Sequence, residues 1–221
     1  MRVVIAGGHG KIGLRLARLL GEHKQHAVGL LRNADHQDDL VAVGAHPVLF
    51  DLETGSAPDL AGILTGADAV VFAAGAGPGS GAPRKDSMDR GGAVLLAQAC
   101  ELAGVRRYLM ISAMGAEGSA ADSSVEADDV FAAYLAAKKA ADDDLRSRDL
   151  DWTILRPGML TMASGTGHVR LAERTGRGEV PREDVAAVLL ALLNEPRTAG
   201  LTLELVAGDT PIAQAVAAVV G

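Results

Sequence analysis

The sequence predicts a single α/β domain built on a doubly wound parallel sheet, and three observations support this prediction. A β-branched apolar run near the N-terminus leads directly into a glycine-rich turn and then into an amphipathic helical pattern. Apolar, β-rich runs then alternate with helical patterns, which is typical of a parallel sheet covered by helices on both faces. The chain has 221 residues, of which 48% are hydrophobic and only 3% aromatic, so one core of aliphatic side chains is expected.

The expected strands are short apolar runs, at residues 3–6, 27–31, 47–50, 69–73, 108–111, 152–155 and 201–205. Helical periodicity predicts helices over residues 11–21, 38–43, 59–64, 86–103, 127–148, 182–193 and 211–219. Right-handed crossovers place the first strand at the centre of the sheet, beside the topological switch where a cofactor would lie. Residues 75–84 and 114–126 have no regular pattern and are expected to be functional loops.

The glycine-rich turn, IAGGHGKIG at residues 5–13, has the chemistry of a pyrophosphate-binding turn. Gly7, Gly10 and Gly13 form GxxGxxG, the phasing we favour, whereas Gly8, Gly10 and Gly13 form the overlapping GxGxxG. Gly7 can adopt backbone angles that a Cβ forbids, Gly10 lets the main chain approach a phosphate, and Gly13 lets the new helix pack against the strand. Because N–H groups at a helix start attract a diphosphate, we expect a bound dinucleotide.

The residue after the second strand indicates which dinucleotide is bound. NAD-binding folds usually carry an acidic residue there, about 20 residues after the glycines. This chain has Arg32, whose guanidinium would attract the additional 2′-phosphate of NADP. Asp35 is acidic but lies beyond the expected strand. The sequence therefore predicts NADP(H), with a solvated loop arginine as the alternative.

Three residues form a candidate catalytic set. Ser112 directly follows the strand at 108–111, and Tyr134 and Lys138 form YxxxK on one face of a helix. A lysine ammonium near a phenol would lower the phenol pKa from its usual value of about 10, so Tyr134 could exchange a proton with a carbonyl. The Ser112 hydroxyl could hold the substrate oxygen. The alternative for YxxxK alone is an ordinary exposed helix rich in alanine.

Taken together, these residues resemble the short-chain dehydrogenase/reductase superfamily, whose Rossmann-type fold the predicted sheet would share. More narrowly, the chain is similar to the atypical group of NAD(P)-binding, NAD-dependent epimerase/dehydratase-like proteins, in which a short C-terminal part replaces a larger substrate domain. The resemblance covers nearly the whole chain. It rests on the GxxGxxG turn, Arg32-Asn33, Asp51-Leu52, Ala73-Ala74-Gly75, Ser112, Tyr134 with Lys138, Arg156-Pro157-Gly158, residues 181–186 and residues 208–212.

The resemblance implies a cofactor-binding role for several of these motifs. The implied residues are Gly7, Gly8, His9, Gly10, Lys11, Ile12 and Gly13 at the pyrophosphate, Arg32 followed by Asn33 at the 2′-phosphate, Asp51 and Leu52 at the adenine, Ala73, Ala74 and Gly75 on the ribose side, Lys138 at the nicotinamide ribose, and Pro157, Gly158, Met159 and Leu160 beside the nicotinamide. One departure concerns Asp89, which stands where better-known members have a helical Asn that organises a proton-relay water. An ionised carboxylate there would change the charge of the relay.

Composition argues against several other classes of protein. A net charge of −7 and a pI near 5.3 disfavour nucleic acid as a partner. Cys100 is the only cysteine and is expected in the core, and His23 and His26 are expected on the surface, so no metal site is predicted. The N-terminus lacks a signal-peptide pattern and no apolar run approaches the roughly 18 residues of a membrane span, which predicts a cytoplasmic protein without membrane contact. The oligomeric state is left open.

The predicted function is that of an NADP(H)-binding oxidoreductase that transfers hydride to a small carbonyl or quinone-like acceptor. Two alternatives remain, an epimerase or dehydratase with bound NADP and a non-catalytic NADP sensor resembling NmrA-like regulators. The whole chain, 1–221, is expected to be one domain, with residues 157–180 and the C-terminal segment on the substrate side. Arg170, Arg174 and Arg177 could line a site for an anionic substrate or belong to a solvated surface, and the sequence assigns them no role.

Overall fold

The computed structural model describes residues 1–77, 79–118 and 129–221. Much of the expected loop at 114–126 and the first residues of the expected helix at 127–148 therefore lie outside the described residues. The strands are β1 (Arg2–Ala6), β2 (His26–Leu31), β3 (His46–Leu49), β4 (Ala69–Phe72), β5 (Arg107–Ile111), β6 (Asp151–Pro157), β7 (Met159–Thr161), β8 (His168–Ala172), β9 (Glu179–Pro181), β10 (Leu201–Ala207) and β11 (Thr210–Pro211). All seven expected strands are present.

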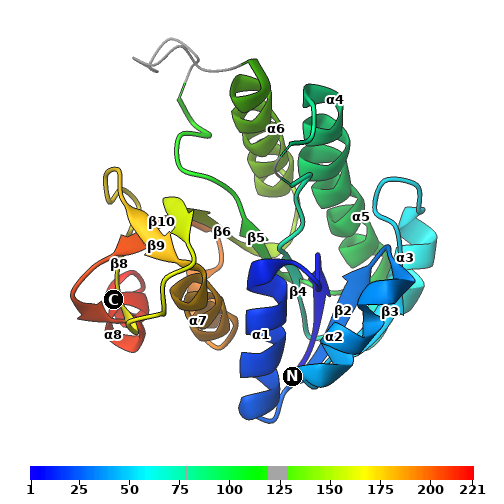
Figure 1. Ribbon diagram of the computed structural model, residues 1–221, viewed down its shortest axis with the longest axis horizontal. Coiled ribbons are helices and arrows are strands. Elements are labelled where there is room, and N and C mark those ends of the chain that lie inside the picture. The colour runs from blue at the N-terminus through cyan, green and yellow to red at the C-terminus, as the bar shows by residue number, and fades with distance from the viewer. Residues whose placement is uncertain (78, 119–128) are drawn as a thin grey trace.

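Nine of these strands form one sheet in the order β11-β8-β10-β6-β5-β4-β1-β2-β3 (Figure 1). The strands from β3 to β10 in this order are parallel, and β8 is antiparallel to both β10 and β11. The sheet reverses its direction of winding between β1 and β4, which confirms the predicted doubly wound order. The crevice at the carboxyl ends of these two strands is where such folds bind ligands.

The α-helices are α1 (Lys11–Glu22), α2 (Gln37–Ala42), α3 (Ala57–Leu64), α4 (Ala82–Arg84), α5 (Ala93–Ala103), α6 (Asp129–Arg146), α7 (Arg182–Leu193) and α8 (Ile212–Ala218). Short 3₁₀ helices η1 (Ala34–His36) and η4 (Pro196–Thr198) flank α2 and α7. The helix expected at 86–103 differs from the prediction, because its first half, η2 (Lys85–Gly92), is a π-helix that continues into α5. π-helical turns are rare in proteins, and those that do occur often lie at functional sites.

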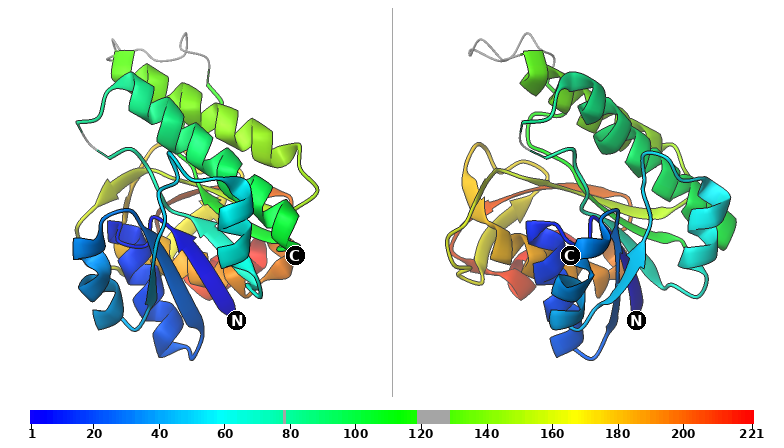
Figure 2. Two further views of the ribbon diagram at one scale, coloured as in Figure 1. Left: turned by 90° about the vertical axis from the view of Figure 1, so that its right-hand side faces the viewer. Right: turned by 45° about the vertical axis from the view of Figure 1, so that its right-hand side comes forward.

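Helices cover both faces of the sheet, with α5 and α6 side by side on one face and α1 and α7 on the other (Figure 2). Alternate residues of β1 serve the two cores: Val3 and Ile5 pack with α1 and α7, whereas Val4 and Ala6 pack with α3 and α5. Cys100 is fully buried in the second core, as predicted. Burial raises the pKa of its thiol to about 12, which keeps it protonated and inert.

The region from 159 to 181 contains strands β7, β8 and β9, which were not predicted from the sequence. Strands β7 and β9 form a separate two-stranded parallel sheet, while β8 extends the main sheet beyond β10. In β8 the buried Val169 and Leu171 alternate with the exposed His168 and Arg170, so its alternating pattern contains only two buried apolar residues. Such short strands carry too little periodicity to stand out from a loop. Within the described residues, no helix is both long enough and apolar enough to span a membrane.

Candidate functional site

The glycine turn between β1 and α1 is packed so closely that three of its positions exclude a side chain. A Cβ on Gly7, which has a φ of 84°, would lie 2.7 Å from the Cα of Ala74. A Cβ on Gly8 would lie 2.6 Å from the Cα of Gly29, and one on Gly13 would lie 2.7 Å from the carbonyl oxygen of Gly8. Both glycine phasings of the sequence thus have a structural reason. Gly13 packs against the turn itself, and no side chain caps the start of α1, so its first N–H groups remain available to an anion.

Two cavities lie along this crevice and share the strand-end segment Ala73, Ala74, Gly75 and Ala76. The outer cavity, of about 320 Å³, lies over the glycine turn and the ends of β2 and β3. The inner cavity, of about 810 Å³, lies over the ends of β5 and β6 and is bounded by η2, α6 and β7. An extended molecule lying across the shared segment would reach both cavities.

A carboxylate joins two guanidinium groups at the outer cavity. Glu53 Oε2 accepts hydrogen bonds from Arg32 and from Arg84, each at 3.3 Å, and Glu53 Oε1 accepts one from the Ser87 hydroxyl at 2.6 Å. Arg32 and Arg84 both line the cavity, and their side chains are 53% and 36% exposed. The position expected to hold a phosphate therefore contains two cations that share one internal anion.

His9 and His36 form a stacked pair at the same cavity, with ring centroids 3.7 Å apart. His9 Nε2 lies 2.7 Å from Asp39 Oδ2. The imidazole of His9 is thus held by α2 and by the ring of His36, beside the glycines that would contact a phosphate.

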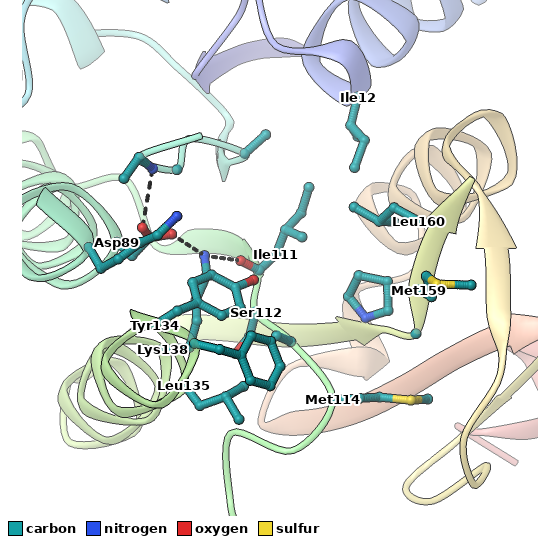
Figure 3. Close-up of a pocket in the computed structure, with 18 of the residues that line it drawn as sticks. Ile12, Asp89, Ile111, Ser112, Met114, Tyr134, Leu135, Lys138, Met159 and Leu160 are labelled. Carbon is teal, nitrogen blue, oxygen red and sulfur yellow. Dashed lines mark hydrogen bonds and ion pairs between the residues drawn. The ribbon is translucent and has the colours of Figure 1, made fainter. Parts of the chain in front are cut away.

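The inner cavity has a buried ion pair at its base (Figure 3). Lys138 Nζ lies 3.2 Å from Asp89 Oδ1 and donates a hydrogen bond to the carbonyl oxygen of Ile111 at 3.1 Å. The other carboxylate oxygen of Asp89 accepts a hydrogen bond from the N–H of Ala76 at 3.1 Å. Lys138 is 4% exposed and Asp89 is 1% exposed, so the pair is shielded from solvent. Asp89 thereby connects the π-helix η2, the segment shared by the cavities and α6.

Tyr134 lies one turn before Lys138 on α6 and lines the same cavity (Figure 3). Lys138 Nζ is 5.9 Å from the centroid of its ring, and Lys85 Nζ is 5.4 Å from it. Burial, followed by the negative charges of Asp89 and Asp142, raises the pKa of Tyr134 to about 12. This direction is opposite to the one predicted from the sequence, where neither the burial of the phenol nor the carboxylate that pairs with Lys138 could be seen. The phenol is therefore fully protonated near neutral pH.

Ser112 lines the inner cavity, but its hydroxyl oxygen has no exposed surface. It lies beside Asp142, a fully buried carboxylate whose Oδ2 is 2.6 Å from Arg156. Burial raises the pKa of Asp142, and the Arg156 guanidinium and the Ser112 hydroxyl offset part of this effect. Arg156 also contacts Glu117 at 2.8 Å. The Arg-Pro-Gly motif at the end of β6 thus contributes a buried cation that holds α6 and the loop after β5.

The motif at residues 181–186 organises the far wall of the cavity. Arg182 donates hydrogen bonds to the carbonyl oxygens of Leu160 and Thr161, each at 3.0 Å. Asp184, which is 2% exposed, accepts N–H groups from Thr166 and Gly167 at 3.0 and 2.9 Å. The start of α7 therefore fixes the chain that leads from β7 to β8.

Most residues predicted to form the site are brought together, and a few are not. The outer cavity is lined by Gly7, His9, Gly10, Arg32, Asp51 and Leu52, the shared segment includes Ala73, Ala74 and Gly75, and the inner cavity is lined by Ile12, Ser112, Tyr134, Lys138, Pro157, Gly158, Met159 and Leu160. Four predicted residues line neither cavity: Gly8, Lys11, Gly13 and Asn33. Gly8 and Gly13 pack the turn, while the side chain of Asn33 accepts the N–H of Asp35 at the start of η1.

Sequence reasoning missed Arg84, Glu53 and Arg182. Arg84 and Glu53 are 31 positions apart and meet only through the tertiary fold, so no local pattern marks them. Arg182 is the first residue of α7, and it is followed by the acidic Glu183 and Asp184. This pattern signals the start of a helix and carries no information about a cavity. Among the described residues, no group of three or more His, Cys, Asp or Glu is arranged to hold a metal ion.

Comparison with known proteins identifies the class to which this fold and site belong. The model of the NAD(P)H-binding family matches residues 7–196. The chain is 36% identical to "Uncharacterized sugar epimerase YhfK" of Bacillus subtilis over 97% of its own length and 98% of that protein. The chain therefore belongs to the NAD(P)H-binding family, which confirms the NAD(P)-binding, epimerase/dehydratase-like resemblance expected from the sequence.

Two solved structures are similar over nearly their full length. A protein from Bacillus halodurans described as "Putative NAD-dependent epimerase/dehydratase" superposes with a TM-score of 0.89 at 34% identity, covering 99% of this chain and all of that one. The oxidoreductase ylbE from Lactococcus lactis superposes with a TM-score of 0.86 at 25% identity, covering 99% and 96% of the two chains. These similarities confirm the predicted Rossmann-type fold, and the similar proteins are described as an oxidoreductase and as epimerase-like proteins.

Proposed function

We propose that this protein is an NADPH-dependent oxidoreductase that reduces a small carbonyl or quinone-like acceptor in the inner cavity. The observation that carries the proposal is the continuity of the two cavities, which would place one end of a dinucleotide at Arg32 and the other beside Tyr134. Nicotinamide supplies the hydride when it is bound. The glycine turn fits this cofactor, because it excludes side chains and leaves the start of α1 open to a diphosphate.

The preference for NADPH rests on the charges at the outer cavity. Arg32 and Arg84 would form charge-assisted hydrogen bonds to a 2′-phosphate, displacing or sharing Glu53. A neutral ribose would gain nothing comparable from two guanidinium groups. The implied contacts of Asp51 and Leu52 with the adenine are consistent with their place in the wall of this cavity.

Tyr134 is proposed as the proton donor to the acceptor oxygen. A pKa of about 12 keeps its hydroxyl protonated, which suits an acid in the direction of carbonyl reduction. Lys138 is proposed to bind the nicotinamide ribose, at a position fixed by Asp89 and by Ile111. Ser112 would hold the acceptor oxygen only in a χ1 rotamer that exposes its hydroxyl to the cavity, because the hydroxyl oxygen is buried and has no hydrogen-bond partner among the described residues.

The test is oxidation of NADPH by the pure protein in the presence of a panel of quinones and aldehydes. Loss of a general acid lowers turnover by about 10²- to 10⁴-fold, so Tyr134→Phe should lose activity to this extent while binding NADPH as the wild type does. Tyr108→Phe is the matched control, because the only other tyrosine is buried and donates its hydroxyl to Ala93 away from the cavity. Undiminished turnover in Tyr134→Phe would refute the assignment.

The same assay separates the alternatives. The names of two relatives favour an epimerase or dehydratase, which would keep NADP bound and would consume no NADPH. Such an enzyme would interconvert or dehydrate a sugar substrate without net oxidation of the cofactor. Tight NADPH binding without any turnover would instead favour a sensor that resembles NmrA-like regulators.

A further inference from the structure

The inner cavity combines apolar walls with cationic charge, which restricts what it can bind. Its lining contains four basic residues, Lys85, Lys138, Arg177 and Arg182, against one acidic residue, Asp89. The whole chain carries a net charge of −7, so this concentration of positive charge runs against the overall composition. An excess of cations in a cavity of an acidic protein indicates an anionic ligand.

Three of these cations are already committed to protein partners. Lys138 is neutralised by Asp89, and Arg182 donates to two main-chain carbonyl oxygens of the cavity wall. Lys85 donates to the carbonyl oxygen of Gly77 at 2.8 Å. Arg177 has no hydrogen bond or ion pair to any residue that the structure describes, and it is exposed.

Arg177 lines the inner cavity from the turn between β8 and β9. The next residue, Gly178, accepts the N–H of Met159 at 2.9 Å, which ties this turn to β7 beside the cavity. Of the three arginines at 170, 174 and 177, only Arg177 lines the cavity. Arg170 lies in β8, and Arg174 faces Glu117 at 3.8 Å with a side chain that is 85% exposed. The fold therefore distinguishes among three arginines that the sequence could not rank.

The rest of the cavity lining is largely apolar and partly open to solvent. Phe131 is 52% exposed and Met159 is 67% exposed, and both line the inner cavity with Met114 and Leu135. Figure 3 shows Tyr134 and Leu135 on one side of the cavity and Met159 and Leu160 on the other. Exposed large apolar side chains around a concave site are typical of a surface that an apolar ligand covers.

We propose that the inner cavity binds an apolar organic acid, with its carboxylate at Arg177 and its hydrocarbon body between Phe131, Met114 and Met159. The proposal deepens the function proposed above, on which it rests, by assigning the acceptor to carbonyl compounds that carry a carboxylate. Arg177 is then a specificity-determining residue, since a charge-assisted hydrogen bond discriminates an acid from its neutral amide.

The experiment measures binding and does not depend on turnover. Isothermal titration of the NADP⁺-saturated protein compares 2-naphthoate with 2-naphthamide, two probes that differ only in the charged group. A hydrogen bond to a charged group should make the acid bind roughly 10- to 100-fold more tightly than the amide. Arg177→Gln should abolish this preference, whereas the matched control Arg174→Gln should retain it. Met159→Gln should weaken both probes equally.

Several results would overturn the proposal. Equal affinities for acid and amide in the wild type, no binding of either probe, or an undiminished preference in Arg177→Gln would each do so. Weaker NADPH binding in Arg177→Gln would likewise oppose it, because Arg177 would then serve the cofactor. Failure of the proposed oxidoreductase function is seen separately, as binding of the acid without turnover of any acceptor in the NADPH assay.

Discussion

Replacing Glu53 by Gln should strengthen the binding of NADPH and leave that of NADH unchanged. Glu53 Oε2 lies 3.3 Å from one nitrogen of Arg32 and from two nitrogens of Arg84, so a 2′-phosphate has to compete with this carboxylate for both guanidinium groups. The amide oxygen of Gln still accepts the Ser87 hydroxyl, which Glu53 Oε1 accepts at 2.6 Å, and this keeps the local fold. The substitution therefore removes the competing charge with little other change.

The magnitude follows from the exposure of the three side chains. The Arg32, Arg84 and Glu53 side chains are 53%, 36% and 19% exposed, so each ion pair is worth about 0.2–1 kcal/mol, as measured for exposed pairs, rather than the several kcal/mol of an unscreened charge pair. Two such pairs amount to roughly 0.4–2 kcal/mol, which corresponds to about 2- to 30-fold tighter NADPH binding. Arg32→Gln removes a charge-assisted contact of about 1.5–3 kcal/mol and should weaken NADPH binding by roughly 10- to 150-fold.

The assay is a fluorescence titration of NADPH and NADH with each variant. Glu22→Gln is the control, because Glu22 forms a comparable ion pair with Arg18 at 2.9 Å within α1, distant from both cavities. If Glu53→Gln weakened NADPH binding, or changed NADPH and NADH binding equally, the placement of the 2′-phosphate at these arginines would be refuted.

Two further predictions concern packing and ionisation. Gly13→Ala should destabilise the protein by about 1–3 kcal/mol, because the new Cβ would press on the glycine turn. Gly21→Ala in the same helix should stabilise it by about 0.5–1 kcal/mol, because the nearest atom to its Cβ is 3.8 Å away. Denaturant unfolding measures both free energies, and an unchanged free energy of unfolding in Gly13→Ala would contradict the packing argument. Burial raises the pKa of both Tyr108 and Tyr134, the latter to about 12, so tyrosinate absorbance should be absent in the folded protein near pH 10 and present in denaturant. A group whose pKa is raised by folding stabilises the protein below its unfolded pKa, so stability should fall as the pH rises from about 10 toward 12, and tyrosinate formation in the folded state near pH 10 would contradict this.

The fold was predictable because it depends on patterns that are local in the sequence. Strand β1 and helix α1 each carry their own periodicity, and the glycines between them report backbone contacts within a few residues and with the end of β4. Ser112, Tyr134 and Lys138 could be grouped from the sequence, because Ser112 directly follows a strand and the YxxxK spacing puts the other two residues on one face of a helix. Contacts between distant elements were not predictable in this way. The pairing of Lys138 with Asp89, separated by 49 positions, depends on how η2 packs on α6. Burial of the Tyr134 phenol, with the negative charge of Asp89 as a smaller cause, raises its pKa instead of lowering it.

The buried charges of α6 explain how this helix orients the Tyr134 side chain, although apolar packing in the core does not by itself set that orientation. Tyr134, Lys138 and Asp142 follow one another at four-residue spacing and therefore lie on one stripe of the helix. Lys138 pairs with Asp89 of η2, and Asp142 pairs with Arg156 at the end of β6, all four being at most 4% exposed. Buried ion pairs contribute little net stability compared with apolar packing, but breaking one costs about 3–5 kcal/mol, since it leaves an uncompensated charge. The small alanine side chains of α6 would still pack if the helix rotated about its axis, but such a rotation would break the Lys138–Asp89 and Asp142–Arg156 pairs together. The two pairs therefore set the rotation of the helix, and with it the direction in which the Tyr134 side chain extends into the cavity.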